Sequence, residues 1–185
     1  MLLPCCYLAP VSHYSACLHA PEVRLEVCDH FTKQTLRNRC LIDSPQGVLA
    51  LTVPVVKPDG KAPMRDIRIS DHGKWQHQHW NALTSSYSQS PFFEYYADDF
   101  APFYQKRWEF LADFNEALMA LCTELLDITR PMPRTTTYEG DALAALPPFT
   151  PRPYYQMFAS RHGFLPDLSI VDLLFNLGPE GVLWL

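Results

Sequence analysis

The segment Lys33–Val56, KQTLRNRCLIDSPQGVLALTVPVV, decides the fold of the amino-terminal half. Leu36–Ile42 and Val48–Val56 are rich in apolar and β-branched residues, a composition that predicts two strands. Between them, Asp43–Gly47 contains the proline and the glycine that tight turns favour. The segment therefore predicts a β-hairpin, from which the rest of the chain extends.

The basic start of this segment is the first candidate site. Lys33, Arg37 and Arg39 lie within seven positions, and alternate residues of a strand share one side, so the two arginines are expected side by side, with Asn38 opposite. Neighbouring guanidinium groups repel unless an anion, a carboxylate or water lies between them, and the planar fork of arginine suits carboxylate or phosphate. We therefore predict an anion-binding site. The alternative is a solvated or salt-bridged strand face, paired for instance with Asp29 or Glu26, each pair contributing about 0–1 kcal/mol.

The pattern before the hairpin favours strands and the pattern after it favours helices. Met1–Ala9 predicts a buried strand, Val11–Leu18 a short helix, and Val23–Cys28 a half-exposed strand. The elements predicted after the hairpin are a short strand at Asp66–Ser70, helices from Asp71 or Gly73 to Tyr87, from Pro91, over Lys106–Asp127 and over Ile170–Leu177, and a proline- and threonine-rich loop near 129–152. We expect one α/β domain over 1–185, with α+β as the alternative. Its residues 1–70 are expected to form a mixed sheet with one short helix, and residues 71–185 a helical half packed on it.

Composition limits the possible functions. With 185 residues, 48% of them hydrophobic, the chain suffices for one core but not for two domains. A net charge of -5 gives no general attraction to nucleic acid. The longest apolar stretch, Val48–Val56, is far shorter than the roughly 20 residues of a membrane span. No secretory signal is recognised, so we expect a cytoplasmic protein whose six cysteines are reduced thiols.

Three histidines are candidate metal ligands. His72, His77 and His79 lie within eight residues. On the predicted helix, however, His77 and His79 point about 200° apart, which prevents chelation from one face. Cys5 and Cys6 are adjacent rather than at ligand spacing. We therefore predict no metal site and no resident cofactor.

A second candidate site precedes the last predicted helix. In Arg161-His162-Gly163, the His162 imidazole is a candidate general base. The alternative is a structural loop in which His162 bonds to backbone. For Asp172 we favour a structural role, completing a capping box with Ser169.

Several motifs together resemble the WbqC-like family of bacterial proteins. They are Tyr7-Leu8-Ala9-Pro10, Asp29, Lys33–Arg39, Leu51–Val55, Asp66–Ser70, Trp75 with His79-Trp80, Ser90–Tyr96, Arg161–Pro166 and Leu168–Asp172. The similarity extends over nearly the whole chain, with the motifs in order. Two positions depart from it. Many relatives have His-Gln-Pro where this chain has Leu3-Pro4-Cys5, and many have a lysine near Ala16.

The resemblance implies a setting in surface-polysaccharide (O-antigen) biosynthesis, where a glycine- or acyl-transferring role has been suggested for some members. The expected function is transfer of an acyl or aminoacyl group to an amino sugar from an activated donor. Arg37, Arg39 and Lys33 would bind the anionic part of the substrate, with Asp29 lining the site. Asn38 and Tyr7 would orient the substrate. His162 would remove the proton from the attacking amine.

The alternative is a non-catalytic module that binds a nucleotide sugar or a biosynthetic enzyme. A catalyst requires Arg37, Arg39 and His162 in one pocket, whereas a module does not. The expected partners are a small anionic substrate and, among proteins, either a second copy of the chain or a biosynthetic enzyme. A third idea, a nucleotidyltransferase, lacks the His-x-Gly-His motif.

Overall fold

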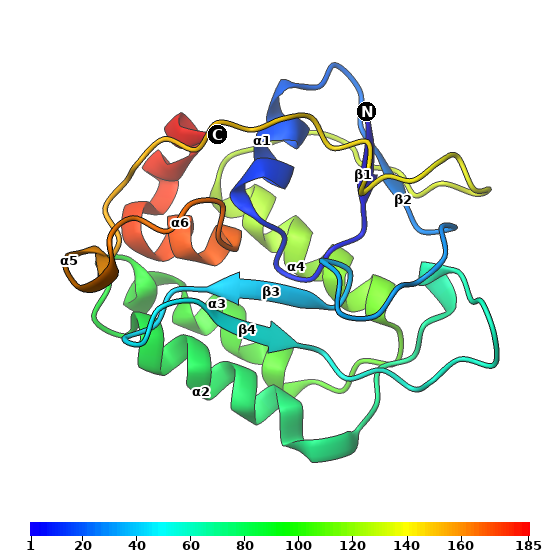
Figure 1. Cartoon of the computed structure of the whole chain (residues 1–185), viewed down its shortest axis with the longest axis horizontal. Helices are drawn as coiled ribbons and strands as arrows, with labels where there is room; N and C mark the ends of the chain where they lie inside the picture. Colours follow the sequence, from blue (N-terminus) through cyan, green and yellow to red (C-terminus); the bar gives the residue numbers. More distant parts are fainter.

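The computed structural model describes all 185 residues, and the predicted hairpin lies across its middle (Figure 1). Strands β3 (Arg39–Ile42) and β4 (Leu49–Thr52) pair antiparallel, with Arg39 opposite Thr52. The strands are shorter than predicted, because residues 33–38 form a turn in which Thr35 O accepts bonds from the backbone N–H groups of Asn38 and Arg39. Arg37 therefore precedes the strand, and the expected alternation of the two arginines on one strand was wrong.

A second small sheet lies beside the hairpin. It consists of β1 (Leu2–Pro4) and β2 (Arg24–Glu26), which run parallel and are joined through helix α1 (Val11–His19). The mixed α and β class is confirmed, but the parallel and antiparallel pairs belong to two separate sheets. On its other side, Leu25 of β2 bonds to the backbone of Pro133 and Thr135. The loop predicted near 129–152 is thereby held against β2.

The second half of the chain is helical, as predicted. Its helices are α2 (Trp75–Tyr87), α3 (Phe93–Gln105), α4 (Leu111–Leu125), α5 (Ala159–His162) and α6 (Ile170–Leu177), with short 3-10 turns at η1 (Met64–Asp66), η2 (His72–Lys74) and η3 (Gly178–Trp184). Helix α4 begins later than predicted, since residues 106–110 are not helical and Glu109 O accepts a bond from Ile69 N. The strand predicted at Asp66–Ser70 is reduced to isolated bridges that involve Arg68 and Ile69. None of the helices combines the length and apolar character needed to cross a membrane.

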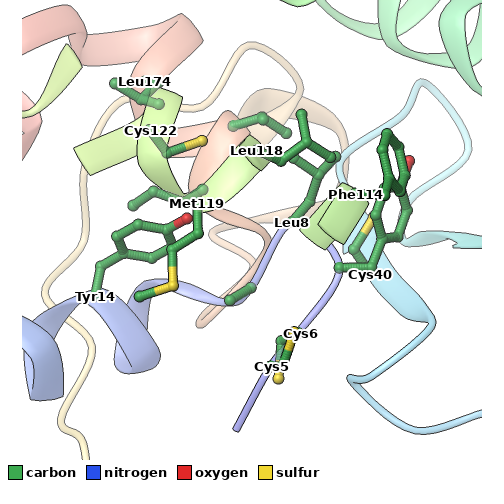
Figure 2. Packing of buried hydrophobic residues seen from close by; sticks show 14 of the residues in the cluster. Cys5, Cys6, Leu8, Tyr14, Cys40, Phe114, Leu118, Met119, Cys122 and Leu174 are labelled. Atoms are coloured by element: carbon green, nitrogen blue, oxygen red, sulfur yellow. The ribbon is translucent and has the colours of Figure 1, made fainter. Parts of the chain in front are cut away.

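Helix α6 lies at the centre because nearly all of its side chains are apolar. Seven of its eight residues, Ile170 to Asn176, are buried. It packs against α1, α3 and α4, and Figure 2 shows Leu174 of α6 gathered with Leu8 and with Leu118 and Cys122 of α4. One apolar cluster of 40 buried residues runs from Leu3 to Phe175. The two ends of the chain therefore contribute to the same core.

Candidate functional site

The strongest polar pair in the hairpin region is Arg37 with Asp29. The Arg37 side chain is 6% exposed, and its Nε and Nη2 both donate to Asp29 Oδ2, Nε at 3.1 Å. The other oxygen, Asp29 Oδ1, is buried without a hydrogen-bond partner. The positive charge of Arg37 is thus already neutralised within the protein.

Asp29 and Arg37 line a cavity of about 380 Å³. One wall comes from residues 29–37 and the other from residues 138–143 of the long loop. The lining residues are Asp29, His30, Thr32, Thr35, Arg37, Tyr138, Asp141 and Leu143. Six of these eight side chains carry an aliphatic hydroxyl, imidazole, carboxylate or guanidinium group, and the other two are the phenol of Tyr138 and the apolar Leu143. The cavity therefore suits a hydrogen-bonding ligand.

The electrostatic balance of this cavity is negative. Burial raises the pKa of the Asp29 carboxyl group, the charges of Glu26 and Asp141 act in the same direction, and Arg37 opposes them. Asp141 forms no ion pair, and its Oδ1 accepts bonds from the backbone N–H groups of Leu143 and Ala144. With Arg37 paired to Asp29, the unpaired charge at the cavity is the carboxylate of Asp141.

The other predicted binding residues do not converge on this cavity. Arg39 Nε donates to Thr52 Oγ1 at 2.9 Å across the hairpin, and Lys33 is exposed. Asn38 is buried, where its Oδ1 accepts from Gln34 N and its Nδ2 donates to Val53 O. The expectation of two guanidinium groups side by side on one anion therefore needs correction: one is neutralised by an acid and the other bonds to a threonine.

Tyr7 lies in the core. Its Oη is 2.8 Å from His79 Nδ1 and 3.0 Å from Tyr104 Oη, and it has no exposed surface. Burial lowers the pKa of His79 to about 4, so this imidazole is neutral at physiological pH. We assign the three residues to a buried hydrogen-bonded chain and leave Tyr7 out of the candidate site.

His162 lies at the opposite end of β3 from the basic residues. Its Nε2 is 3.0 Å from Asp43 Oδ1, and its Nδ1 is 3.1 Å from Gly163 O. Both ring nitrogens face oxygen acceptors, so neither presents a free lone pair to a substrate. Because a strand rises about 3.3 Å per residue, the two ends of β3 are about 10 Å apart. Arg37, Arg39 and His162 do not share a pocket.

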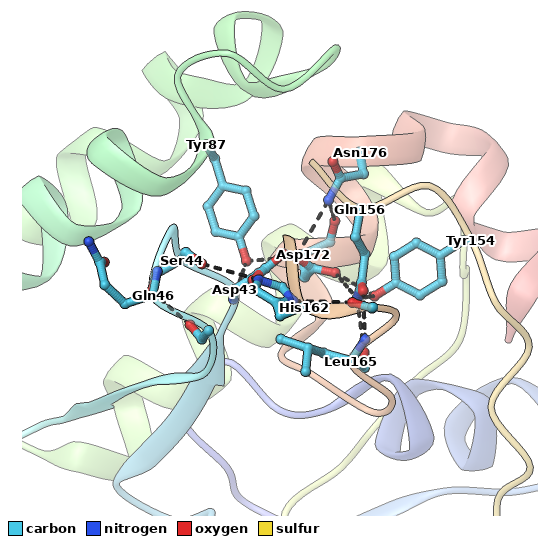
Figure 3. Close-up of polar contacts among 12 residues, drawn as sticks. Asp43, Ser44, Gln46, Tyr87, Tyr154, Gln156, His162, Leu165, Asp172 and Asn176 are labelled. Carbon is cyan, nitrogen blue, oxygen red and sulfur yellow. Dashed lines mark hydrogen bonds and ion pairs between the residues drawn. The ribbon is translucent and has the colours of Figure 1, made fainter. Parts of the chain in front are cut away.

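Beside His162 is a buried carboxylate, Asp172 (Figure 3). It accepts hydrogen bonds from Tyr87 Oη at 2.8 Å, Tyr154 Oη at 2.6 Å and Gln156 Nε2 at 2.8 Å. Burial raises its pKa to about 6 despite these donors. The predicted capping box was wrong, since the Asp172 side chain points to these three groups and Ser169 Oγ has no partner. Asp172 joins α2, α6 and the loop between α4 and α5.

A larger cavity, of about 550 Å³, lies where residues 68–71 and 107–109 run side by side. Its four charged residues form two exposed ion pairs, Arg68 with Glu109 and Arg107 with Asp71. Exposed pairs of this kind contribute little, and the lining carries no unpaired charge. No group of three or more histidine, cysteine, aspartate or glutamate side chains is arranged to hold a metal ion.

Sequence reasoning missed Tyr138 and Asp141, because both lie in a loop without a local motif. No signal in the sequence brings this loop to Asp29. For Asp172 there was a signal: an acid within the otherwise apolar run of α6 has no solvent-facing side available, which indicates a buried polar partner.

Comparison with known proteins gives one family and one curated relative. The model of the WbqC-like protein family matches residues 24–146, which include every residue that lines the Asp29 cavity but neither Tyr7 nor His162. The chain is 28% identical to a Mycobacterium tuberculosis protein named "Uncharacterized protein Rv1507c", over 81% of each chain. No solved structure matches. The chain belongs to the WbqC-like protein family.

Proposed function

We propose that the protein binds an amino sugar in the cavity formed by Asp29, Arg37, Tyr138 and Asp141, as a component of surface-polysaccharide biosynthesis. The observation that carries the proposal is the polarity of this cavity. Its arginine is neutralised by Asp29, and the unpaired Asp141 leaves the lining negative. A negative site attracts the ammonium group of an amino sugar and repels phosphate.

The size and composition of the cavity support the same ligand class. A volume of about 380 Å³ accommodates a single sugar ring. The hydroxyl groups of Thr32 and Thr35 offer hydrogen bonds to sugar hydroxyls, and Tyr138, 62% exposed, offers an aromatic face at the rim. The surface-polysaccharide setting comes from the resemblance to the family.

Transfer of an acyl or aminoacyl group to the bound amine is a second candidate. It is favoured by Asp29, whose raised pKa makes it a stronger base than a free carboxylate, and whose Oδ1 lacks a partner. In such a transfer the amine nitrogen attacks the acyl carbon of an activated donor, the donor's leaving group departs, and the amine proton passes to Asp29. The separation of His162 from this cavity removes it from the step, so the non-catalytic role is the leading proposal.

Isothermal titration calorimetry with glucosamine, glucose and glucose 1-phosphate at neutral pH tests the binding proposal. We expect glucosamine to bind about tenfold more tightly than glucose, and glucose 1-phosphate to bind least. Asp141→Asn should remove the preference for glucosamine, whereas Asp98→Asn, an exposed acid on α3, should retain it. Tighter binding of the phosphate, or no binding of any sugar, contradicts the proposal.

Incubation of the protein with glucosamine and, in turn, an acyl thioester, an acyl-adenylate and an aminoacyl-tRNA tests the transfer. Mass spectrometry detects an N-acylated product. A product that disappears in Asp29→Asn supports catalysis, and sugar binding without product from any donor supports the non-catalytic role.

A further inference from the structure

The cavity lined by Asp29 and Arg37 is called the sugar cavity below, and one of its walls is a segment without helix or strand. Residues 135–143 carry Tyr138 and Asp141, which line the cavity opposite Asp29. An irregular segment keeps one shape only where its backbone polar groups find partners. The position of this wall therefore depends on whatever bonds it to the rest of the molecule.

The buried side chain of Glu26 connects this wall to the other side of the cavity. Glu26 Oε1 accepts bonds from Cys28 N at 2.7 Å and Thr135 Oγ1 at 2.8 Å, and its Oε2 accepts from Glu139 N at 2.8 Å. Cys28 directly precedes Asp29, and Glu139 directly follows Tyr138. The Glu26 carboxylate thus bonds to a residue next to Asp29 on one wall and to a residue next to Tyr138 on the other.

Thr135 strengthens this connection. Its Oγ1 donates to Glu26 and accepts a bond from Val27 N at 3.2 Å. Both side chains are buried, Glu26 with no exposed surface and Thr135 with 5%. The Thr135 hydroxyl therefore bonds the start of the wall to Glu26 of β2 and to the following residue, Val27.

Glu26 is also unusual as a charge. It lies within the strand predicted as half-exposed over Val23–Cys28, yet it is fully buried and forms no ion pair with any cation. Burying an unpaired carboxylate is costly, and three charge-assisted hydrogen bonds offset that cost. A neutral residue at this position would avoid the cost of burying a charge, but it would not act electrostatically on the cavity. It acts on Asp29, raising the pKa of that carboxyl group.

We propose that Glu26 is a positioning residue of the sugar cavity, which fixes the wall carrying Tyr138 and Asp141 relative to Asp29 and adds to the negative potential of the cavity. The inference rests on the proposed function for its ligand. The fixing of the wall itself does not depend on any ligand.

Glu26→Gln keeps the size of the side chain, removes the charge, and places an amide N–H₂ group against a hydrogen-bond donor. Amide hydrogen exchange should accelerate at residues 136–143 and stay unchanged in α4. Glucosamine should bind about tenfold more weakly. Protonation of Asp29 leaves the charge of Arg37 without its partner and cancels the negative charge of the cavity, so Asp29 sets an acid limb of glucosamine binding. Because Asp29 loses a neighbouring negative charge in Glu26→Gln, its pKa falls, and this limb should move to lower pH. A purely structural role would leave that limb in place.

If Glu26→Gln does not fold, the matched variants Thr135→Val and Thr135→Ser test whether the bonds to Glu26 fix the wall. Valine removes the hydroxyl and should accelerate exchange in the wall, whereas serine keeps the hydroxyl and should retain wild-type exchange and affinity. If residues 136–143 exchange at the wild-type rate in Glu26→Gln, or in Thr135→Val, the proposal is overturned. Failure of the wild type to bind any sugar overturns the proposed function instead, and the exchange result still decides whether Glu26 holds the wall.

Discussion

At the scale of single residues, the cavity is defined by a buried ion pair. Arg37 is predicted to hold an external anion, but it bonds to Asp29, which the sequence places both among the substrate-site residues and, in the alternative, in a surface salt bridge. The side chains are 6% and 4% exposed, so this pair is not a surface one. The consequence is a change in the sign of the expected ligand, from anion to amine.

Removing one member of this pair should destabilise the fold strongly. Arg37→Ala leaves the Asp29 carboxylate buried without its partner, and we expect the free energy of unfolding to fall by about 3–5 kcal/mol. Urea denaturation measures the change. Arg107→Ala is the matched control, because both members of the Arg107–Asp71 pair are exposed. This variant should lower the free energy of unfolding by less than about 1 kcal/mol. Similar losses in both variants would contradict the buried pair.

Asp172 predicts a specific pH dependence of stability. Its pKa is about 6 in the folded chain, above the value of about 3.9 expected in the unfolded chain. The protonated form is therefore favoured by folding, and this contribution to stability is present below about pH 4 and is lost as the pH rises through about 6. A shift of about 2 units corresponds to about 3 kcal/mol.

The measurement compares urea denaturation of the wild type and Asp172→Asn between pH 4 and pH 7. The asparagine does not titrate, so the wild type should lose stability relative to the variant by about 3 kcal/mol over this range. A stability difference that stays constant with pH would show that Asp172 keeps an ordinary pKa.

At the scale of elements, helix α6 ends at a glycine with two constraints. Gly178 has φ +60°, and a Cβ on it would lie 2.5 Å from the Phe92 ring. Gly60 has φ +86° but open space around it. The two positions separate the cost of backbone conformation from the cost of a steric clash.

Gly178→Ala should therefore destabilise the chain more than Gly60→Ala. We expect about 1–2 kcal/mol for the left-handed backbone at either position, and a further 1–3 kcal/mol, roughly, for the displaced Phe92 ring at Gly178. Thermal denaturation of both variants checks the difference. Equal costs would mean that the ring moves aside freely.

Local patterns were sufficient for elements whose own residues determine them. The bounds of α6 and the pairing of the hairpin were predicted correctly, because apolar periodicity and turn residues act over a few positions. Helix α4 was predicted five residues too early, since bonding between Ile69 and Glu109 overrides the helical pattern of 106–110. The burial of Glu26 was missed, because its three donors include two from more than 100 residues away.

The candidate site was less predictable than the fold. Asp29 and Arg37 were both named from the sequence, and both line the cavity. Tyr138 and Asp141 were not, because their approach to Asp29 depends on the loop pairing with β2, a contact that no local pattern encodes. His162 and Arg37 were grouped on chemical type alone, and only the three-dimensional arrangement separates them.

At the scale of the whole molecule, all six cysteines are free and five are buried. Burial raises the pKa of Cys5 and Cys122 to about 12, and only Cys28 is partly exposed. In the native protein a thiol reagent such as Ellman's should therefore modify Cys28 quickly and the other five only as the chain unfolds. Cys28→Ser should abolish the fast phase. Fast modification of several thiols would contradict the packing in Figure 2.

The central place of α6 has a consequence for biosynthesis. Residues 170–177 complete a core to which residues 3–9 already belong, and Ala9 O accepts a bond from Ile170 N. A ribosome delivers the first of these segments long before the second, so the apolar interior of the nascent chain stays open until residues 170–177 have been translated. A chain truncated before α6 should therefore be bound by chaperones and degraded rather than accumulate as a folded protein.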